Sequence, residues 1–247
     1  MLEVEAKVAQ LVEHSTENAG VVGSIPSLGT FRVWMELAQK MLSMLAWYIE
    51  LVVAHRTKGI HMKTSKWTSA DLEMLPDDGN RYEIIGGELY VSKQPSNYHQ
   101  LVGDRIWELL QVWSRRTQAG TAITTPGLIF GEDNDVVPDV IWMSKERGAK
   151  ATHPDGKYHA APELVVEILS PGPSNERRDR EAKLQLYAHQ GVLEYWIVSW
   201  IERRLDIYRR DGATLTFHST LTKDGLIQSP YLPGFSCQFS QFFDDIR

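Results

Sequence analysis

Two apolar runs each contain an acid, and no other feature constrains the fold of this chain as strongly. Asp139 stands within residues 137–141 (VPDVI), and Glu167 stands within residues 163–169 (ELVVEIL). β-Branched residues of this kind favour buried strands, where an unpaired carboxylate is costly to remove from water. Each acid must therefore be paired, hydrogen-bonded or bound to a cation. Such breaks in an apolar pattern tend to mark functional sites.

The pattern around these two runs predicts an α/β domain. Apolar spacing predicts a long helix over 98–116, and further helices are expected over 68–74 and 174–190. A Gly86-Gly87 turn joins two short runs into a hairpin near the start of the domain. Polar segments separate several further strands, which are expected over residues 122–130, 136–143, 163–169, 194–199, 204–209 and 214–218.

Composition fits one globular domain with an appendage, since 43% of the 247 residues are hydrophobic. The single cysteine, Cys237, offers neither an intramolecular disulfide nor a cysteine-based zinc cluster, so a reducing cytoplasm fits best. A net charge of -6 argues against a general basic surface for nucleic acid. It is compatible with a nuclease, because carboxylates gathered for divalent cations are acidic until the cations bind.

The first 61 residues differ from the rest, and we expect the folded domain to occupy residues 62–247. Residues 9–30 resemble the translation of a transfer-RNA gene, which makes Met62 the expected start of the protein. The alternative is a genuine amphipathic N-terminal helix.

Residues 31–55 are strongly apolar, so a membrane span has to be considered. Charged residues, among them Glu36, Lys40 and Glu50, interrupt this segment. The opening residues are acidic, whereas a secretory signal begins with positive charge. We therefore expect neither a membrane span nor a secretory signal.

A third fragment, residues 178–183 (RDREAK), adds a lysine to the two acids. Hydrolysis of a phosphodiester needs charge neutralised on the phosphate, an activated water and support for the leaving oxygen, all of which divalent cations can supply. Magnesium prefers oxygen ligands, and a neighbouring lysine can orient the water or stabilise developing charge. Asp139, Glu167 and Lys183 supply this set.

Several fragments together resemble the PD-(D/E)XK nuclease superfamily and, more closely, its Uma-type putative restriction endonuclease family. The resemblance covers nearly all of residues 62–247. It rests on the hairpin YEIIGGE (82–88), His99 at the start of the long helix, the pair Pro138-Asp139, and the runs PELVVEILSP (162–171) and GVLEYWIV (191–198).

The resemblance implies a restriction endonuclease-like core, in which helices flank a mixed central sheet and a β-hairpin comes first. It implies that Asp139 and Glu167 bind Mg²⁺ (or Mn²⁺) and that, with Lys183, they form the catalytic set of an endonuclease acting on DNA. A homodimer is a further expectation from the resemblance alone.

The sequence departs from the superfamily pattern at two places. The position two residues beyond Glu167, where a lysine is usual, holds Leu169. The lysine would then have moved to Lys183 on the next helix, one turn after Asp179 and one turn before Tyr187. The smaller departure is Ser199-Trp200, where relatives often have an acidic turn.

Each catalytic assignment has a structural alternative. Asp139 after Pro138 suits an ordinary strand-end turn. Glu167 suits a core acid paired with an arginine. Lys183 suits a solvated helix residue that pairs with Asp179.

Other residues are expected to support the site. Glu83 and Glu88 share a face of the hairpin, Tyr187 lies a turn from Lys183, and His99 opens a helix whose N-terminus attracts anions. Hairpin acids are also commonly solvent-facing, and His99 is equally explained as a partly buried histidine. Arg178 and Arg180 are candidate phosphate contacts, although such a charge run is normally a solvated helix face. The remaining histidines show no arrangement.

These observations predict a metal-dependent DNA endonuclease. Two alternatives stay open: a catalytically inactive nuclease fold that acts as a DNA-binding or interaction module, and a metal-dependent hydrolase acting on RNA. The chain has no GxxxxGK[ST] phosphate-binding loop, so nucleotide-driven restriction is not expected.

Overall fold

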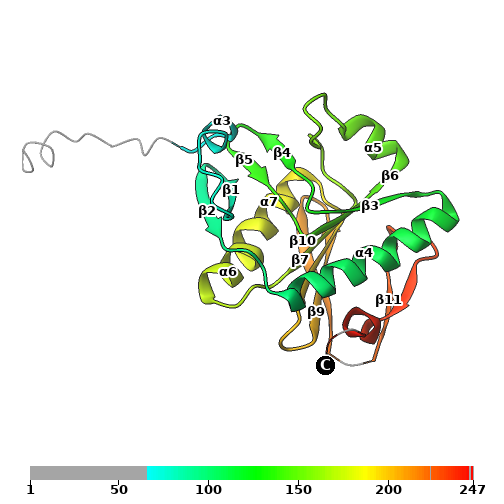
Figure 1. The fold of residues 1–247 in the computed structure, drawn as a ribbon. Coiled ribbons are helices and arrows are strands. Elements are labelled where there is room, and N and C mark those ends of the chain that lie inside the picture. The colour runs from blue at the N-terminus through cyan, green and yellow to red at the C-terminus, as the bar shows by residue number, and fades with distance from the viewer. Residues whose placement is uncertain (1–65, 223, 245, 247) are drawn as a thin grey trace, which may run out of the picture. The chain divides into compact units, whose positions relative to one another are not determined.

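A computed structural model describes residues 66–222, 224–244 and 246 (Figure 1). The expectations for residues 1–61, and the domain start at Met62, lie outside the described residues. None of the helices in the described ranges combines the length and the apolar character needed to cross a bilayer.

A mixed six-stranded sheet forms the centre of the domain, as predicted. Only β7 and β8 run parallel, and every other neighbouring pair is antiparallel. In spatial order the strands are β10 (Thr214–Leu221), β9 (Arg204–Asp211), β8 (Glu194–Ser199), β7 (Leu164–Ile168), β6 (Val140–Ser144) and β3 (Gly120–Thr124).

A second sheet of four strands contains the predicted hairpin. Its order is β2 (Glu88–Ser92), β1 (Arg81–Ile85), β5 (Asn134–Val136) and β4 (Leu128–Gly131). Gly86 and Gly87 have φ angles of 61° and 83°, a backbone region that glycine enters without steric cost, and this confirms the two-residue turn. The short helix α3 (Ser69–Leu72) precedes the hairpin, with Thr68 at its N-cap.

Two expected strands are wrong as single elements, because the chain passes between the two sheets within each of them. The first breaks at Thr125, Pro126 and Gly127, between β3 and β4, where Thr125 has a φ of 46°. The second breaks between β5 and β6 at Pro138, which has no N–H to give to a ladder. This second break puts Asp139 at the entrance to the central sheet.

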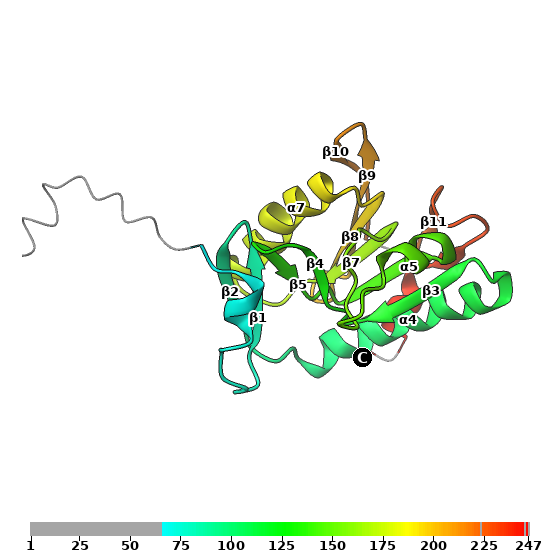
Figure 2. The ribbon, with the colours of Figure 1, turned by 90° about the horizontal axis from the view of Figure 1, so that it is seen from above.

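Helices cover both faces of the central sheet (Figure 2). On one face, α4 (Asn97–Thr117) buries Val102, Ile106 and Leu110 in a cluster with alternate residues of β6 and β7. The same cluster includes side chains of the C-terminal elements β11 (Leu226–Gln228), β12 (Ser236–Gln238) and the 3-10 helix η2 (Phe239–Phe243). The opposite cluster contains Leu186 and Tyr187 of α7 (Lys183–Gln190).

The expected helix over 174–190 has an irregular middle. It consists of α6 (Pro173–Arg177), the π-helical segment η1 (Arg178–Ala182) and α7, and it ends at Gly191, whose φ is 93°. In η1 the amide of Lys183 donates to the carbonyl of Arg178, five residues earlier. Single π turns inside helices frequently occur at functional sites.

Sequence reasoning missed the small elements. The helix α5 (Lys145–Ala151) lies in the stretch expected to be a polar connection, and Ser144 caps it by accepting from the amide of Arg147. The strands β11 and β12 and the helix η2 were also not expected, because their apolar residues are too few to show a period.

Candidate active site

The alternation of side chains along β7 decides where Glu167 points. Val166 and Ile168 pack in the cluster beneath α4, whereas Val165 packs in the cluster beneath α7. Because successive strand residues face opposite sides, Glu167 faces α7. Its Oε1 accepts hydrogen bonds from Lys183 Nζ at 2.9 Å and from the hydroxyl of Tyr187 at 2.8 Å. The expected Glu167, Lys183 and Tyr187 are therefore in direct contact.

Asp139 lies beside Glu167 at the edge of the ladder between β6 and β7. Val140 pairs with Val166, so the next antiparallel positions along the ladder are Asp139 and Glu167. The Oδ2 of Asp139 accepts from the backbone amide of Ile168 at 2.8 Å. Glu167 on β7 and Asp139 just before β6 thus take neighbouring positions where the chain enters the central sheet, and the charge of Asp139 acts on Glu167.

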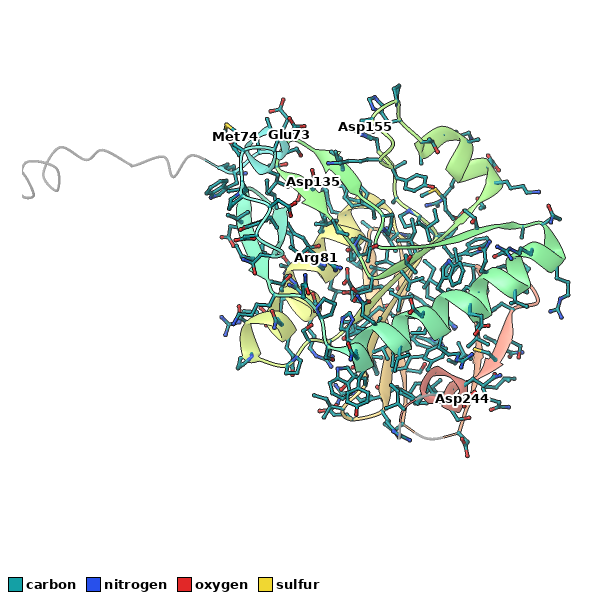
Figure 3. The ribbon with its side chains drawn as sticks, in the orientation of Figure 1. Glu73, Met74, Arg81, Asp135, Asp155 and Asp244 are labelled. Carbon is teal, nitrogen blue, oxygen red and sulfur yellow. The ribbon has the colours of Figure 1, made fainter. Side chains whose placement is uncertain are left out.

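A histidine and an arginine contact Asp139. His99 Nε2, from the first turn of α4, lies 3.3 Å from Oδ2. Arg81, labelled in Figure 3, begins β1 and lies with its Nη1 3.3 Å from Oδ1. His99 was expected near the site, but Arg81 was not, because nothing in the local sequence shows that the hairpin approaches β6.

Lys183 lies among three carboxylates. Its Nζ is 2.8 Å from Glu83, 2.9 Å from Glu167 and 4.0 Å from Asp179. The side chain is 1% exposed, which excludes the alternative of a solvated helix residue. Glu83 also accepts from the amide of Val137 at 2.9 Å, which ties the hairpin to the segment that carries Asp139.

We call the buried group Glu83, Asp139, Glu167, Asp179, Arg178 and Lys183 the acid cluster. Sequence reasoning missed Asp179 as a member, although its register with Lys183 was visible. With all groups ionised, four carboxylates share two cations, so the acid cluster has excess negative charge that Arg81 only partly offsets. Such an excess in a buried site favours the binding of a cation.

The pKa values reflect this crowding. Burial raises the pKa of Glu167, and nearby Asp139, Asp179 and Glu83 add to that rise against the opposing effect of Lys183. Burial also raises the pKa of Asp139. The hydrogen bond and charge interaction with His99, together with the hydrogen bond from the amide of Ile168, outweigh burial and lower this pKa to about 2.

For Lys183, burial disfavours the charged amine, yet the carboxylates of Glu167, Glu83 and Asp179 outweigh it and raise its pKa. Lys183 is therefore a cation at neutral pH and can donate hydrogen bonds, but it is not a base.

The remaining expected residues are less central. Glu88 is exposed and accepts from the hydroxyl of Tyr90 at 3.1 Å, outside the acid cluster. Arg178 forms two bonds to Asp179, at 2.8 and 3.2 Å, and Arg180 bonds to Asp206 at 2.8 Å. Both arginines bind protein carboxylates here, and their contact with phosphate stays a prediction.

The carboxylate oxygens of Asp139 and Glu167 suit a hard divalent cation, which prefers oxygen ligands. Both hydrogen bonds to Glu167 fall on Oε1, so Oε2 has no hydrogen-bond partner among the described residues. Of the side chains that contact Asp139, Arg81 is the more exposed, at 27%, so an incoming cation would displace it more easily than His99. These two acids therefore fit a site for Mg²⁺ or Mn²⁺.

Comparisons with known proteins agree with this fold. A family model, Uma2, described as "Putative restriction endonuclease", matches residues 69–240. The uncharacterized protein slr1290 of Synechocystis sp. is 30% identical over 136 residues, which are 53% of this chain and 67% of that protein.

A solved structure, of a putative nuclease belonging to DUF820 from Anabaena variabilis, matches 71% of this chain and 97% of that one. The TM-score is 0.57 and the sequence identity is 17%, so this likeness shows the fold alone. The expected restriction endonuclease-like fold is confirmed.

Proposed function

The chain belongs to the Uma2 family of putative restriction endonucleases, and on that premise we propose that it is a metal-dependent endonuclease that hydrolyses phosphodiester bonds in DNA. One observation carries the proposal: Asp139 and Glu167 adjoin at the end of a strand ladder, with the amine of Lys183 bonded to Glu167. This combination of two acids and a lysine suits phosphodiester hydrolysis.

Asp139 and Glu167 would hold the ion in this proposal. A bound Mg²⁺ or Mn²⁺ would neutralise charge on the scissile phosphate and lower the pKa of a bound water. The protein's own part is to fix the two carboxylates before substrate arrives. The amide of Ile168 and His99 fix Asp139, and Tyr187 fixes Glu167.

Lys183 would act as a positively charged donor. Because its pKa is raised, it keeps its proton at neutral pH. It can therefore orient the attacking water or stabilise charge on the phosphate oxygens, and the proton of the water must go elsewhere. Glu83 contributes by holding the lysine amine at 2.8 Å, which makes it a positioning residue.

A groove beside the acid cluster supports a nucleic-acid substrate. Its volume is about 570 Å³, and its lining includes Glu88, Tyr90, Ser174, Arg177 and Arg178. Arg178 belongs both to this lining and to the acid cluster, so the groove adjoins the proposed site. The exposed Arg177 is free of the short ion pairs that hold Arg178 and Arg180 within the described residues, and it is therefore the better phosphate contact.

Plasmid cleavage tests the proposal. Purified protein should nick or cut supercoiled DNA with Mg²⁺ or Mn²⁺, and EDTA should stop it. Asp139→Asn and Glu167→Gln should each lower the rate about a hundredfold or more. The matched control is Glu194→Gln, a buried acid outside the acid cluster, which should still cut. Cutting that persists in both site variants would refute the assignment, and RNA in the same assay would test the alternative substrate.

The contacts of Asp139 favour a second candidate, a catalytically inactive nuclease fold that binds DNA. Both carboxylate oxygens of Asp139 already face protein donors, namely Arg81 on Oδ1 and His99 with Ile168 on Oδ2. An inactive module would bind DNA in a gel-shift assay without cutting it. It would also show no Mg²⁺ binding that depends on both Asp139 and Glu167.

A further inference from the structure

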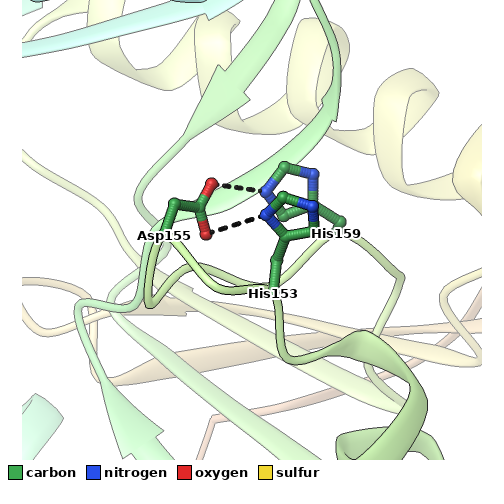
Figure 4. Close-up of side chains that lie close together, drawn as sticks. All are labelled: His153, Asp155 and His159. Atoms are coloured by element: carbon green, nitrogen blue, oxygen red, sulfur yellow. Dashed lines mark hydrogen bonds and ion pairs between the residues drawn. The ribbon is translucent and has the colours of Figure 1, made fainter.

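A second group of metal-binding side chains lies on the loop after α5, and the proposed nuclease chemistry does not use it. His153, Asp155 and His159 converge there (Figure 4). Asp155 lies beside both rings, with Oδ1 3.4 Å from His153 Nδ1 and Oδ2 2.8 Å from His159 Nε2. The sequence shows no arrangement of these histidines, because only the fold of the loop brings them together.

The spacing of the three donors suits one ion. One nitrogen or oxygen from each residue lies within 4.8 Å of the others. Two donors about 2.1 Å from a shared ion are about 3.0 Å apart at a right angle and about 3.4 Å apart at the tetrahedral angle. The 3.4 Å from Asp155 Oδ1 to His153 falls in that range, and the 2.8 Å from Oδ2 to His159 is slightly shorter, so a small movement would bring the donors around one ion.

The backbone holds this loop in place without a metal. The amide of His153 donates to Lys157 at 3.0 Å, and that of His159 donates to Ala151 at 2.8 Å. Tyr158 forms two backbone bonds to the segment around β4, to Gly127 at 3.0 Å and from Ile129 at 2.9 Å. The ligands are therefore preorganised, which lowers the entropy lost when an ion binds.

We propose that His153, Asp155 and His159 form a second metal site, which takes a divalent transition-metal ion of the zinc type. Two imidazole nitrogens and one carboxylate oxygen suit Zn²⁺, Ni²⁺ or Cu²⁺, whereas Mg²⁺ prefers oxygen ligands alone. The two sites would thus select different ions.

The site has open coordination positions. Zinc is usually four-coordinate, and three protein ligands with one free position are typical of sites that admit water or another molecule. The three side chains are 33% to 55% exposed, so solvent and outside ligands reach them. The site is therefore accessible to an ion added to the folded protein.

Calorimetry with ZnCl₂ on the full chain, in excess Mg²⁺, tests this proposal. The wild type should take up one more Zn²⁺ than the double variant His153→Ala/His159→Ala, or bind it about tenfold or more tightly. The measurement is the difference in Zn²⁺ binding between the wild type and the double variant, not the total uptake, because three further histidines, His14, His55 and His61, lie outside the described residues. His189→Ala, which removes an exposed histidine of α7, is the matched control and should behave as wild type.

Cu²⁺ spectroscopy gives a second readout that does not depend on nuclease activity. The paramagnetic resonance spectrum of the wild type should show nitrogen coupling that the double variant lacks. Asp155→Asn keeps the shape of the loop and should weaken binding without removing the nitrogen signal. Equal Zn²⁺ binding and equal Cu²⁺ spectra in the wild type and the double variant would overturn the proposal. A failure of DNA cleavage alone would leave it unaffected.

Discussion

Glu167 and Glu194 are buried acids on neighbouring parallel strands, but their surroundings differ. Glu194 begins β8 and receives hydrogen bonds from Trp196 at 2.7 Å, Ser229 at 2.8 Å and Arg209 at 3.2 Å. One carboxylate thus has one cation and two neutral donors. Glu167, by contrast, shares Lys183 with Glu83 and Asp179.

Glu194 and Glu167 show how a structural acid differs from a candidate metal ligand. A structural acid such as Glu194 has its charge balanced and both oxygens bonded. The acid cluster has more carboxylates than cations, and an oxygen of Glu167 is left for another partner. Burial alone is the same in both cases, so partner number and charge balance carry the distinction.

The strongest test of this comparison removes the shared cation. Lys183→Met leaves Glu83, Glu167 and Asp179 without their central positive charge in a buried site. We expect the free energy of unfolding to fall by about 3 to 5 kcal/mol, measured by urea titration. Adding Glu167→Gln should recover part of that loss, because the two changes are coupled. An unchanged urea midpoint for Lys183→Met would contradict the claim that three buried carboxylates depend on this one cation.

Removing the cation beside Glu194 should lower the free energy of unfolding by less. Arg209→Met removes the cation from Glu194, but Trp196 and Ser229 still donate to it. Arg209 is also 22% exposed, so water can partly replace it. We expect a loss of about 1 to 2 kcal/mol in the same urea titration. A loss as large as that of Lys183→Met would show that the two sites do not differ as described.

Asp206 offers the smallest effect and tests pH dependence. It pairs with Ile197, which in turn pairs with Glu167, so it lies in the same row of the sheet. Burial opposes its ionisation, but hydrogen bonds from Thr220 and Arg180 and the charge of Arg204 lower its pKa below the usual 3.8. A lowered pKa means that the stabilisation is present above about pH 4 and is lost as the pH falls through the folded-state value.

Asp206→Asn should therefore cost about 1 kcal/mol at pH 7 and less at pH 3. Urea titrations of the wild type and the variant at the two pH values measure this difference in the loss of unfolding free energy. Parallel losses at both pH values would rule out the stated ion pairs as its cause.

Much of the fold was visible in the sequence, because its main elements have strong local signals. The Gly86-Gly87 turn and the apolar spacing of α4 gave the hairpin and the long helix nearly to the residue. The crossings between the two sheets were not visible. Thr125 and Pro138 interrupt runs that remain apolar on both sides, so periodicity alone cannot show that the chain changes sheets.

The candidate site was visible only in part. Asp139 and Glu167 stood out because each interrupts an apolar run, and Lys183 joined them because phosphodiester hydrolysis is aided by a cation beside the acids. The position of Asp179 in the site depends on the π-helical segment, and that of Arg81 depends on the packing of the hairpin. Neither is a property of the local sequence. The sequence showed no arrangement of His153 and His159, and only the bonded loop brings them to Asp155.

Asp139 and Glu167 are proposed to share one hard cation, and Mg²⁺ titration calorimetry on the full chain measures whether they do. Mg²⁺ avoids the imidazole ligands of the loop after α5, so the signal belongs to carboxylate sites. We expect Mg²⁺ binding in the wild type and in Glu194→Gln, and its loss in both Asp139→Asn and Glu167→Gln. Mg²⁺ binding that is unchanged in the two site variants, or absent from the wild type, would contradict it.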